Sequence, residues 1–293
     1  MDSFIGAIDL IESGVRPLLL GHHSSADVSA PQVACADYLR EFYPTRGPEL
    51  FRAYIGVSRQ MFDGIEESTR SSSFLFFSLA AACAAALGEK SHLIVPENGF
   101  ISLNPPLTPL RLGALSTRTT HPYFMARFQD LLDALELGIQ MDNPYHFKTK
   151  GEMILECRNA KALKKFSHKT MSCAHSAAGR YEKQPGLHCG TCMPCIVRQA
   201  AFIAVHLPDK TTYRRLLHQK RALDSMKSEG EDVRACQVAI SRLKNDPTVA
   251  EIEVYQSGPL PEPPDLVSQY ISVYQRGMAE VASLLANVKV KPR

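Results

Sequence analysis

Apolar residues recur at helical and strand spacings through the first 140 positions of the chain. Residues 2–14 place apolar side chains on one helical face, and residues 71–87 form a long, mostly apolar helix that Gly88 ends. The expected helices cover residues 2–14, 31–43, 71–87 and 123–137, and the expected strands cover residues 15–21, 51–57 and 92–96. This alternation predicts a parallel sheet with helices on both of its faces.

Two further inferences come from this pattern. Asp2 or Ser3 is expected to cap the first helix, and the apolar run 74–87, too short for the roughly 20 residues of a membrane span, is expected to be a buried helix. Ligands of parallel α/β sheets bind at the carboxyl ends of the strands. The loops to search for chemistry are therefore residues 21–29, 57–72 and 96–121.

The second half of the chain has a different pattern. Residues 148–165 and 194–205 have helical patterns, and residues 168–195 between them are irregular and rich in cysteine. After residue 207 the pattern is helical and highly charged, and a proline-rich linker at 258–264 separates it from a last amphipathic helix at 266–287. We predict an α/β domain at 1–165, a metal-binding segment at 166–206 and a helical extension at 207–293.

Composition indicates a globular protein with no general affinity for polyanions. Hydrophobic residues make up 45% and charged residues 22% of the 293 positions, and 33 basic residues nearly balance 30 acidic ones. We therefore expect neither nucleic acid nor membrane as a partner. The N-terminus lacks the basic region of a secretion signal, so a cytoplasmic location is expected. In that compartment eight cysteines are not expected to form disulfides.

Four of the cysteines have the spacing of a metal site. Cys173 is followed by Cys189, Cys192 and Cys195, so that two CxxC turns overlap. Four thiolates suit tetrahedral Zn²⁺ and leave it no open position, which predicts a structural ion, with an iron–sulfur cluster as the competing interpretation. His175 and His188 lie close enough to replace a cysteine, although each is expected at the surface. The remaining cysteines are expected to be bystanders: Cys35, Cys83, Cys157 and Cys236.

Three segments resemble one enzyme family in the right order. The segment from Ser172 to Phe202, which contains CGTCMPC and IVRQAAF, resembles the zinc-binding end of 7-cyano-7-deazaguanine synthases, the QueC family. Residues 147–153 (FKTKGEM) resemble a second element of that family, and residues 1–14 resemble the part of its SGGxDS pyrophosphatase loop and helix that comes after the two glycines. Residues 96–122 and the long tail are more similar to QueC-like proteins of bacterial anti-phage systems such as Qat.

The resemblance implies a fold, cofactors and site residues. The fold would be a Rossmann-like parallel sheet of the HUP (adenine nucleotide alpha-hydrolase-like) class, with a four-cysteine zinc segment and a helical C-terminal extension. The ligands would be ATP, Mg²⁺ and structural Zn²⁺. The resemblance implies that Asp2, Ser3 and Arg70 bind ATP and that Lys150 is catalytic. It also implies that Glu97, Asn98 and Arg118 bind the substrate.

Each of these assignments has a simpler structural alternative. Asp2 and Ser3 can be helix caps, and Arg70 and Lys150 can be solvated surface charges. Asn98 can cap its own loop, and His121 is as well suited to cap a helix as to act as a base. Because the glycines of the SGGxDS loop are absent, the resemblance implies a chain that begins inside this loop, with its first strand supplied upstream or the gap covered by a partner.

The function implied is adenylation of the carboxylate of a 7-deazaguanine acid by an ATP-dependent ligase of an anti-phage defence system. The acceptor amine would then belong to a co-encoded protein that docks on the charged tail. The alternatives are a housekeeping 7-cyano-7-deazaguanine synthase of queuosine biosynthesis, which uses ammonia, and a non-catalytic binding or scaffold fragment. A homodimer is left open.

Overall fold

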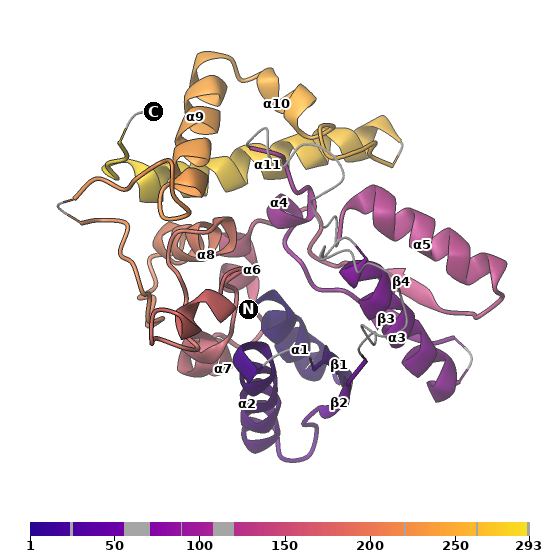
Figure 1. Cartoon of the computed structure of the whole chain (residues 1–293). Coiled ribbons are helices and arrows are strands. Elements are labelled where there is room, and N and C mark those ends of the chain that lie inside the picture. Colours follow the sequence, from indigo (N-terminus) through magenta and orange to yellow (C-terminus); the bar gives the residue numbers. More distant parts are fainter. Residues whose placement is uncertain are drawn as a thin grey trace, which may run out of the picture.

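The N-terminal half of the chain is a mixture of helices and short parallel strands (Figure 1). The computed structural model describes residues 1–23, 26–55, 71–88, 90–107, 120–219, 221–261 and 263–291. In this half the elements are α1 (Asp2–Glu12), β1 (Leu18–His22), α2 (Ala26–Phe42), β2 (Glu49–Ala53), α3 (Ser72–Leu87), β3 (His92–Ile94), α4 (Gly99–Ser102), α5 (Pro122–Ala134) and β4 (Gln140–Asp142).

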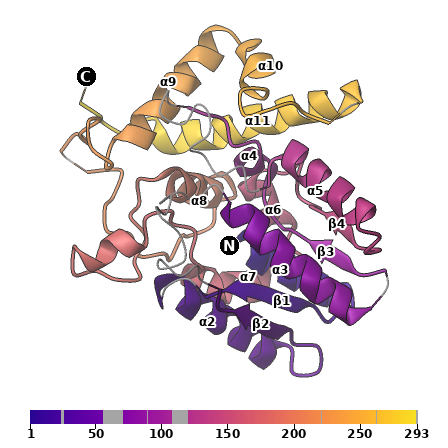
Figure 2. The same cartoon turned by 45° about the vertical axis from the view of Figure 1, so that its right-hand side comes forward.

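The strands form two separate parallel pairs instead of the single sheet expected. β1 pairs with β2, and β3 pairs with β4. Figures 1 and 2 show β1 and β3 as the inner strands and β2 and β4 as the outer ones. Ser91 and Val95 bond β4 through their backbone, so the backbone N–H and C=O groups of His92 and Ile94 point to the opposite edge of β3. No strand among the described residues pairs with these inner edges.

Two apolar clusters pack against the strand pairs. α3 and α5 meet through Phe77 and Phe128, whose rings form an edge-to-face contact, and Leu93 of β3 packs against this cluster. The other cluster joins α1 and α2 to the helices that follow residue 149, and Leu19 of β1 packs against it. The start of α1 is thereby held beside the loops that leave β3 and β4.

The C-terminal half is helical and shares its core with the N-terminal half. Its elements are α6 (Lys150–Glu156), α7 (Ala160–Phe166), the 3₁₀ turns η3 (Ser167–Lys169) and η4 (Ala177–Arg180), α8 (Met193–Ala204), α9 (Glu231–Asn245), α10 (Val249–Glu253) and α11 (Pro264–Leu285). α11 packs against α8 and α9 and also contacts α4 (Figure 2). Phe100 of α4 therefore lies in the same apolar core as Ile196 of α8 and Val273 of α11.

The structure corrects several expected elements. The helix expected over 148–165 breaks at residues 157–159, where Asn159 caps α7 with its side chain. Residues 207–219 and 221–230 contain no helix, although a helical pattern was expected there. β4 and the short helix α4, which lies inside the loop expected at 96–121, were not predicted.

Two local expectations at helices are also wrong. Neither Asp2 nor Ser3 caps α1, because Met1 is its N-cap and no side chain forms a capping hydrogen bond there. The apolar run 74–87 does form a helix, but one side of it is open: Phe74, Phe76 and Leu87 are exposed.

None of the helices in the described part of the chain has both the length and the apolar character that crossing a lipid bilayer requires.

Candidate active site and metal centre

The start of α6 places Lys150 in the interior. Thr149 is the N-cap: its hydroxyl accepts a hydrogen bond from the Glu152 amide at 3.1 Å, and the Glu152 carboxylate accepts one from the Thr149 amide at 2.8 Å. This reciprocal capping box fixes the first turn of α6. Lys150, the first residue of that turn, is only 5% exposed and extends its ammonium to Asp2.

Asp2 is the centre of a group that we call the charged cluster: Asp2, Glu97, Asn98 and Lys150. One carboxylate oxygen of Asp2 bonds the Lys150 ammonium, and the other accepts 2.7 Å and 3.3 Å hydrogen bonds from the side-chain and backbone amides of Asn98. Asn98 also donates to Glu97 at 3.1 Å. Asp2 begins α1, Asn98 follows β3, and Lys150 follows β4. The cluster therefore assembles at the carboxyl ends of the strands, where ligands of such sheets bind.

Burial sets the protonation of the cluster. Burial alone would raise the pKa of Asp2, but the Lys150 ammonium and a hydrogen bond with Glu97 outweigh it and hold that pKa well below its usual range. Burial and the negative charge of Asp2 raise the pKa of Glu97 well above its usual range. Burial lowers the pKa of the Met1 amine, which lies near Asp2 and Lys150, to about 6. The cluster thus contains the ion pair Asp2–Lys150, and Glu97 keeps its proton to a higher pH than an exposed glutamate does.

A cavity of about 270 Å³ adjoins the charged cluster. It lies between α5, the end of β4 and the start of α11, with Met125, Asp142 and Tyr270 among its lining residues. Asn143 connects it to the cluster, because Asn143 lines the cavity while its side-chain amide donates to the Glu97 carbonyl at 2.8 Å. A ligand bound in this cavity would be separated from the charged cluster by Asn143.

The structure brings four of the predicted site residues together and leaves others apart or undescribed. Asp2, Glu97, Asn98 and Lys150 form the charged cluster, whereas Ser3 is exposed on α1. Arg70 and Arg118 lie outside the described residues. The roles of all these residues in binding or catalysis stay predictions.

Two of the simpler structural alternatives are confirmed. The Asn98 side chain accepts from the Ile101 amide at 3.0 Å and caps α4, and the His121 side chain accepts from the Tyr123 amide at 3.3 Å and caps α5. A third alternative is wrong, since Lys150 is not a solvated lysine.

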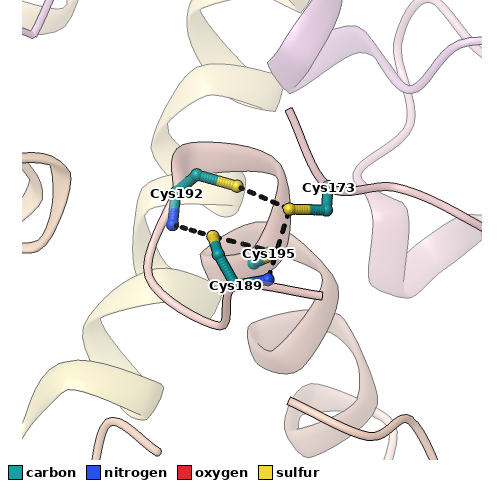
Figure 3. A group of neighbouring side chains, drawn as sticks. All are labelled: Cys173, Cys189, Cys192 and Cys195. Atoms are coloured by element: carbon teal, nitrogen blue, oxygen red, sulfur yellow. Dashed lines mark hydrogen bonds between the residues drawn. The ribbon is translucent and has the colours of Figure 1, made fainter. Parts of the chain in front are cut away.

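The four predicted cysteines form one buried cluster, which we call the cysteine cluster (Figure 3). Their sulfur atoms all lie within 4.8 Å of one another, with Cys189 and Cys195 3.9 Å apart and Cys173 and Cys192 4.0 Å apart. Four sulfurs at about 2.3 Å from one tetrahedral zinc ion lie about 3.8 Å from one another. The cluster therefore has the dimensions to hold a single ion, and zinc is the ion that four thiolates at this spacing suit.

Local backbone geometry prepares the cysteines for this role. Cys192 is the N-cap of α8, which carries Cys195 in its first turn. Amide groups point at two of the sulfurs: the Cys189 amide lies 3.2 Å from the Cys173 sulfur, and the Cys192 amide 3.3 Å from the Cys189 sulfur. Gly190 makes the tight turn at φ +89°, where a side chain would also meet the Arg215 carbonyl.

One of the two neighbouring histidines is not where the sequence predicted it. His175 is exposed as expected, but His188 is 4% exposed and packs edge-to-face on Tyr213. Its Nε2 lies 3.1 Å from the Thr170 carbonyl and its Nδ1 lies 3.8 Å from the Cys195 sulfur. His188 therefore contacts Cys195, one of the predicted zinc ligands, and does not replace it.

Arg198 was overlooked as a structural residue. Its side chain is fully buried and donates to Thr211 at 3.0 Å, to the Thr170 hydroxyl at 2.8 Å and to the Ser167 carbonyl at 2.6 Å. It thus ties α8 to the segment that leads into Cys173. The sequence held a signal for it, since an arginine in an otherwise apolar helical stretch is buried only where it has several acceptors.

The comparisons with known proteins concern the middle of the chain. The model of one family, described as queuosine biosynthesis protein QueC, matches residues 120–206, which is less than a third of the 293 positions. The matched span contains Lys150 and all four cysteines of the cluster, whereas Asp2, Glu97 and Asn98 precede it. Searches of the curated proteins and of the solved structures found no match. Over the matched span, the chain is similar to QueC.

Proposed function

We propose that this chain is an ATP-dependent synthase of the QueC type that activates the carboxylate of a 7-deazaguanine acid. The observation that carries the proposal is the charged cluster, in which residues from the start of α1, the end of β3 and the start of α6 meet around one buried ion pair. The resemblance had assigned these same residues to ATP, to the substrate and to catalysis. The QueC match over the segment with Lys150 and the cysteines supports it independently.

The reaction proposed is adenylation followed by amine transfer. A carboxylate oxygen attacks the α-phosphorus of ATP and pyrophosphate leaves. An amine then attacks the acyl adenylate and AMP leaves. The Lys150 ammonium stabilises the negative charge that develops in the first step. Asp2 holds that ammonium, and with Ser3 and Arg70 it takes the Mg²⁺-pyrophosphate.

The cavity beside the cluster has the character of a heterocycle site. It combines apolar walls, including Met125 and Tyr270, with the carboxylate of Asp142 at the end of β4. Asp142 makes no side-chain hydrogen bond or ion pair with the described residues, so its oxygens can accept the N–H groups of a guanine-like ring. Glu97, Asn98 and Arg118 would complete recognition from the side of the cluster.

We assign the fold to the Rossmann-like class and propose that an extended strand completes it. The support is the open geometry of the two strand pairs, because the inner edges of β1 and β3 face each other and both pairs are parallel. Unpaired backbone groups along two facing edges favour insertion of a strand. Such a strand would join the pairs into one sheet beside the charged cluster.

We place the enzyme in anti-phage defence, with a co-encoded protein as the amine donor. The resemblance of residues 96–122 to QueC-like proteins of such systems supports this role over that of a housekeeping synthase. Product analysis separates the two. A mass increase on a co-encoded protein supports defence, whereas a free nitrile made with ammonia supports queuosine biosynthesis.

The first experiment is ATP–pyrophosphate exchange with 7-carboxy-7-deazaguanine. We expect exchange that requires both the acid and ATP, and we expect Lys150→Met to abolish it. Lys148→Met is the matched control. Lys148 lies two residues earlier, is partly exposed and pairs with exposed Glu156, so its loss should leave the exchange rate unchanged.

Calorimetry separates a catalytic from a non-catalytic chain. Binding of ATP without exchange would favour the scaffold alternative. Absence of both binding and exchange, in a preparation that is folded and contains zinc, would overturn the proposed function.

A further inference from the structure

Helix α11 of the C-terminal extension bonds both residues that flank Lys150. Glu280 accepts a hydrogen bond from the Thr149 hydroxyl and lies 3.4 Å from the Gly151 amide. One turn earlier, Arg276 donates to the Glu152 carboxylate at 2.6 Å and 3.2 Å. Each of the two side chains of the capping box that starts α6 therefore has a second hydrogen-bond partner on α11.

Arg276 also fixes the chain that enters α6. Its guanidinium donates to the Phe147 carbonyl at 2.8 Å, three residues before Lys150. A bidentate arginine–carboxylate pair is directional, because the planar fork matches the carboxylate at one orientation. The backbone on either side of Lys150 is thus held in one place by a single helix.

A neighbouring side of α11 packs against the segment that carries Asn98. Gly277 lies so close to Phe100 that a Cβ atom there would be 2.4 Å from the ring. The ring of Tyr274 lies 6.0 Å from that of Phe100, which is 1% exposed. α11 therefore contacts two of the three segments that form the charged cluster, through polar bonds on one side and close apolar packing on the other.

We propose that Arg276 and Glu280 are positioning residues of the active site, which hold α6 so that the Lys150 ammonium stays aligned on Asp2 and on the reacting phosphate. The identity of that reaction rests on the proposed function. Beyond the proposed function, this role makes the C-terminal extension part of the active site and not only a docking surface for a partner.

The kinetic test compares two substitutions at one position. Glu280→Ala removes both acceptors, and we expect kcat of ATP–pyrophosphate exchange to fall about tenfold to a hundredfold, as small misplacements of a catalytic group do. The KM for ATP should stay within about twofold, because ground-state binding is not altered. Glu280→Gln keeps one acceptor oxygen, which can serve the Thr149 hydroxyl or the Gly151 amide but not both, and it should restore part of kcat. Ser283→Ala, an exposed change one turn on, is the control.

A second readout does not depend on activity. Buried Lys150 should react slowly with an amine-reactive succinimidyl ester, as followed by peptide mass spectrometry. Glu280→Ala should speed its labelling relative to Lys148, while Ser283→Ala should not. If the wild-type chain shows no exchange, the proposed function fails while this measurement still tests the positioning.

Three results would overturn the inference. One is an unchanged kcat and an unchanged Lys150 labelling rate in Glu280→Ala. Another is a loss of kcat in Glu280→Ala that disappears once the exchange rate is divided by the fraction of protein that is folded and contains zinc. If Glu280→Ala does not fold, Arg276→Lys replaces it: this variant keeps the charge, loses the fork, and should lower kcat while melting like the wild type. Wild-type kcat in folded Arg276→Lys would then overturn the inference.

Discussion

The cysteine cluster and the charged cluster are both buried, but their residues are separated by very different lengths of chain. The four cysteines lie between positions 173 and 195, and two turns bring three of them together. The charged cluster joins positions 2, 97, 98 and 150, which only the complete fold brings together. The cysteine cluster is therefore recognisable from its spacing in the sequence, whereas the charged cluster forms only through tertiary structure.

The two clusters should also respond differently to the loss of one of their side chains. A thiolate lost from a tetrahedral site weakens the hold on an ion that stabilises the whole segment. A charge lost from a buried ion pair leaves its partner uncompensated in a medium that solvates it poorly. Both clusters should therefore be sensitive to single substitutions, but the first through the metal and the second through electrostatics.

The largest effect is expected at the cysteine cluster. Cys192→Ala should abolish stoichiometric zinc binding and destabilise the fold, because it removes one of the four predicted thiolate ligands. Metal binding energies of structural zinc sites, about 10–16 kcal/mol in isolated peptides, exceed the stability of most domains. Elemental analysis and thermal unfolding measure the two effects. Cys83→Ala, away from the cluster, is the control and should retain one zinc per chain.

Two results would contradict this prediction. Iron in place of zinc in the purified wild-type chain would replace the assigned ion while keeping the ligands. Full metal content and an unchanged melting temperature in Cys192→Ala would show that the cysteines do not form a metal site.

Sequence patterns predicted those features that depend on residues close together in the chain. The spacing of the cysteines and the apolar faces of α1, α5, α8 and α11 are of this kind, and all are present. β4 was missed because three residues, two of them exposed, carry too little alternation to indicate a strand. The helix after 148 was predicted too long because Asn159 starts a new helix where the apolar pattern continues.

The charged cluster could be predicted only in part. The family resemblance indicated Asp2, Glu97, Asn98 and Lys150 but not that they bond one another. The T-x-x-E sequence from Thr149 to Glu152 is a recognisable capping box and predicts where α6 begins. Nothing local indicates that Arg276 and Glu280, more than 120 positions later, complete that box.

The next largest effect should come from breaking the ion pair of the charged cluster. Lys150→Met leaves the Asp2 carboxylate buried without its cation, and we expect a loss of about 3–5 kcal/mol in the free energy of unfolding. The Lys148–Glu156 pair is the matched comparison: its side chains are 36% and 51% exposed, against 6% for both Lys150 and Asp2. Lys148→Met should therefore cost about 0–1 kcal/mol in urea unfolding.

The double variant Asp2→Asn/Lys150→Met separates stability from chemistry. Removing both charges should recover most of the stability lost in Lys150→Met, because no unpaired charge stays buried. ATP–pyrophosphate exchange should not recover. Additive losses in the double-mutant cycle would show that the two side chains are not coupled, contrary to the geometry.

The smallest effect is expected at Glu97, and it has a defined pH dependence. Because its pKa is raised in the folded chain, the folded state holds the Glu97 proton above pH 4.5, where the unfolded state has released it. Its contribution to stability therefore falls as pH rises from about 4.5 to the pKa of the folded state, by about 1.4 kcal/mol for each unit of the shift. Glu97→Gln cannot ionise and avoids this loss.

The difference in unfolding free energy between Glu97→Gln and the wild type should therefore be smallest near pH 4.5 and should grow, in favour of the variant, as pH rises toward the folded-state pKa of Glu97. Two other groups titrate beside Glu97, but both proteins share them. The lowered pKa of Asp2 adds stability that is lost only as pH falls below its ordinary range, and the Met1 amine titrates near pH 6. Glu251→Gln, an exposed change on α10, should differ from the wild type equally at every pH. If Glu97→Gln does the same, Glu97 is ionised in the folded chain, and the charged cluster then contains two carboxylates against one lysine.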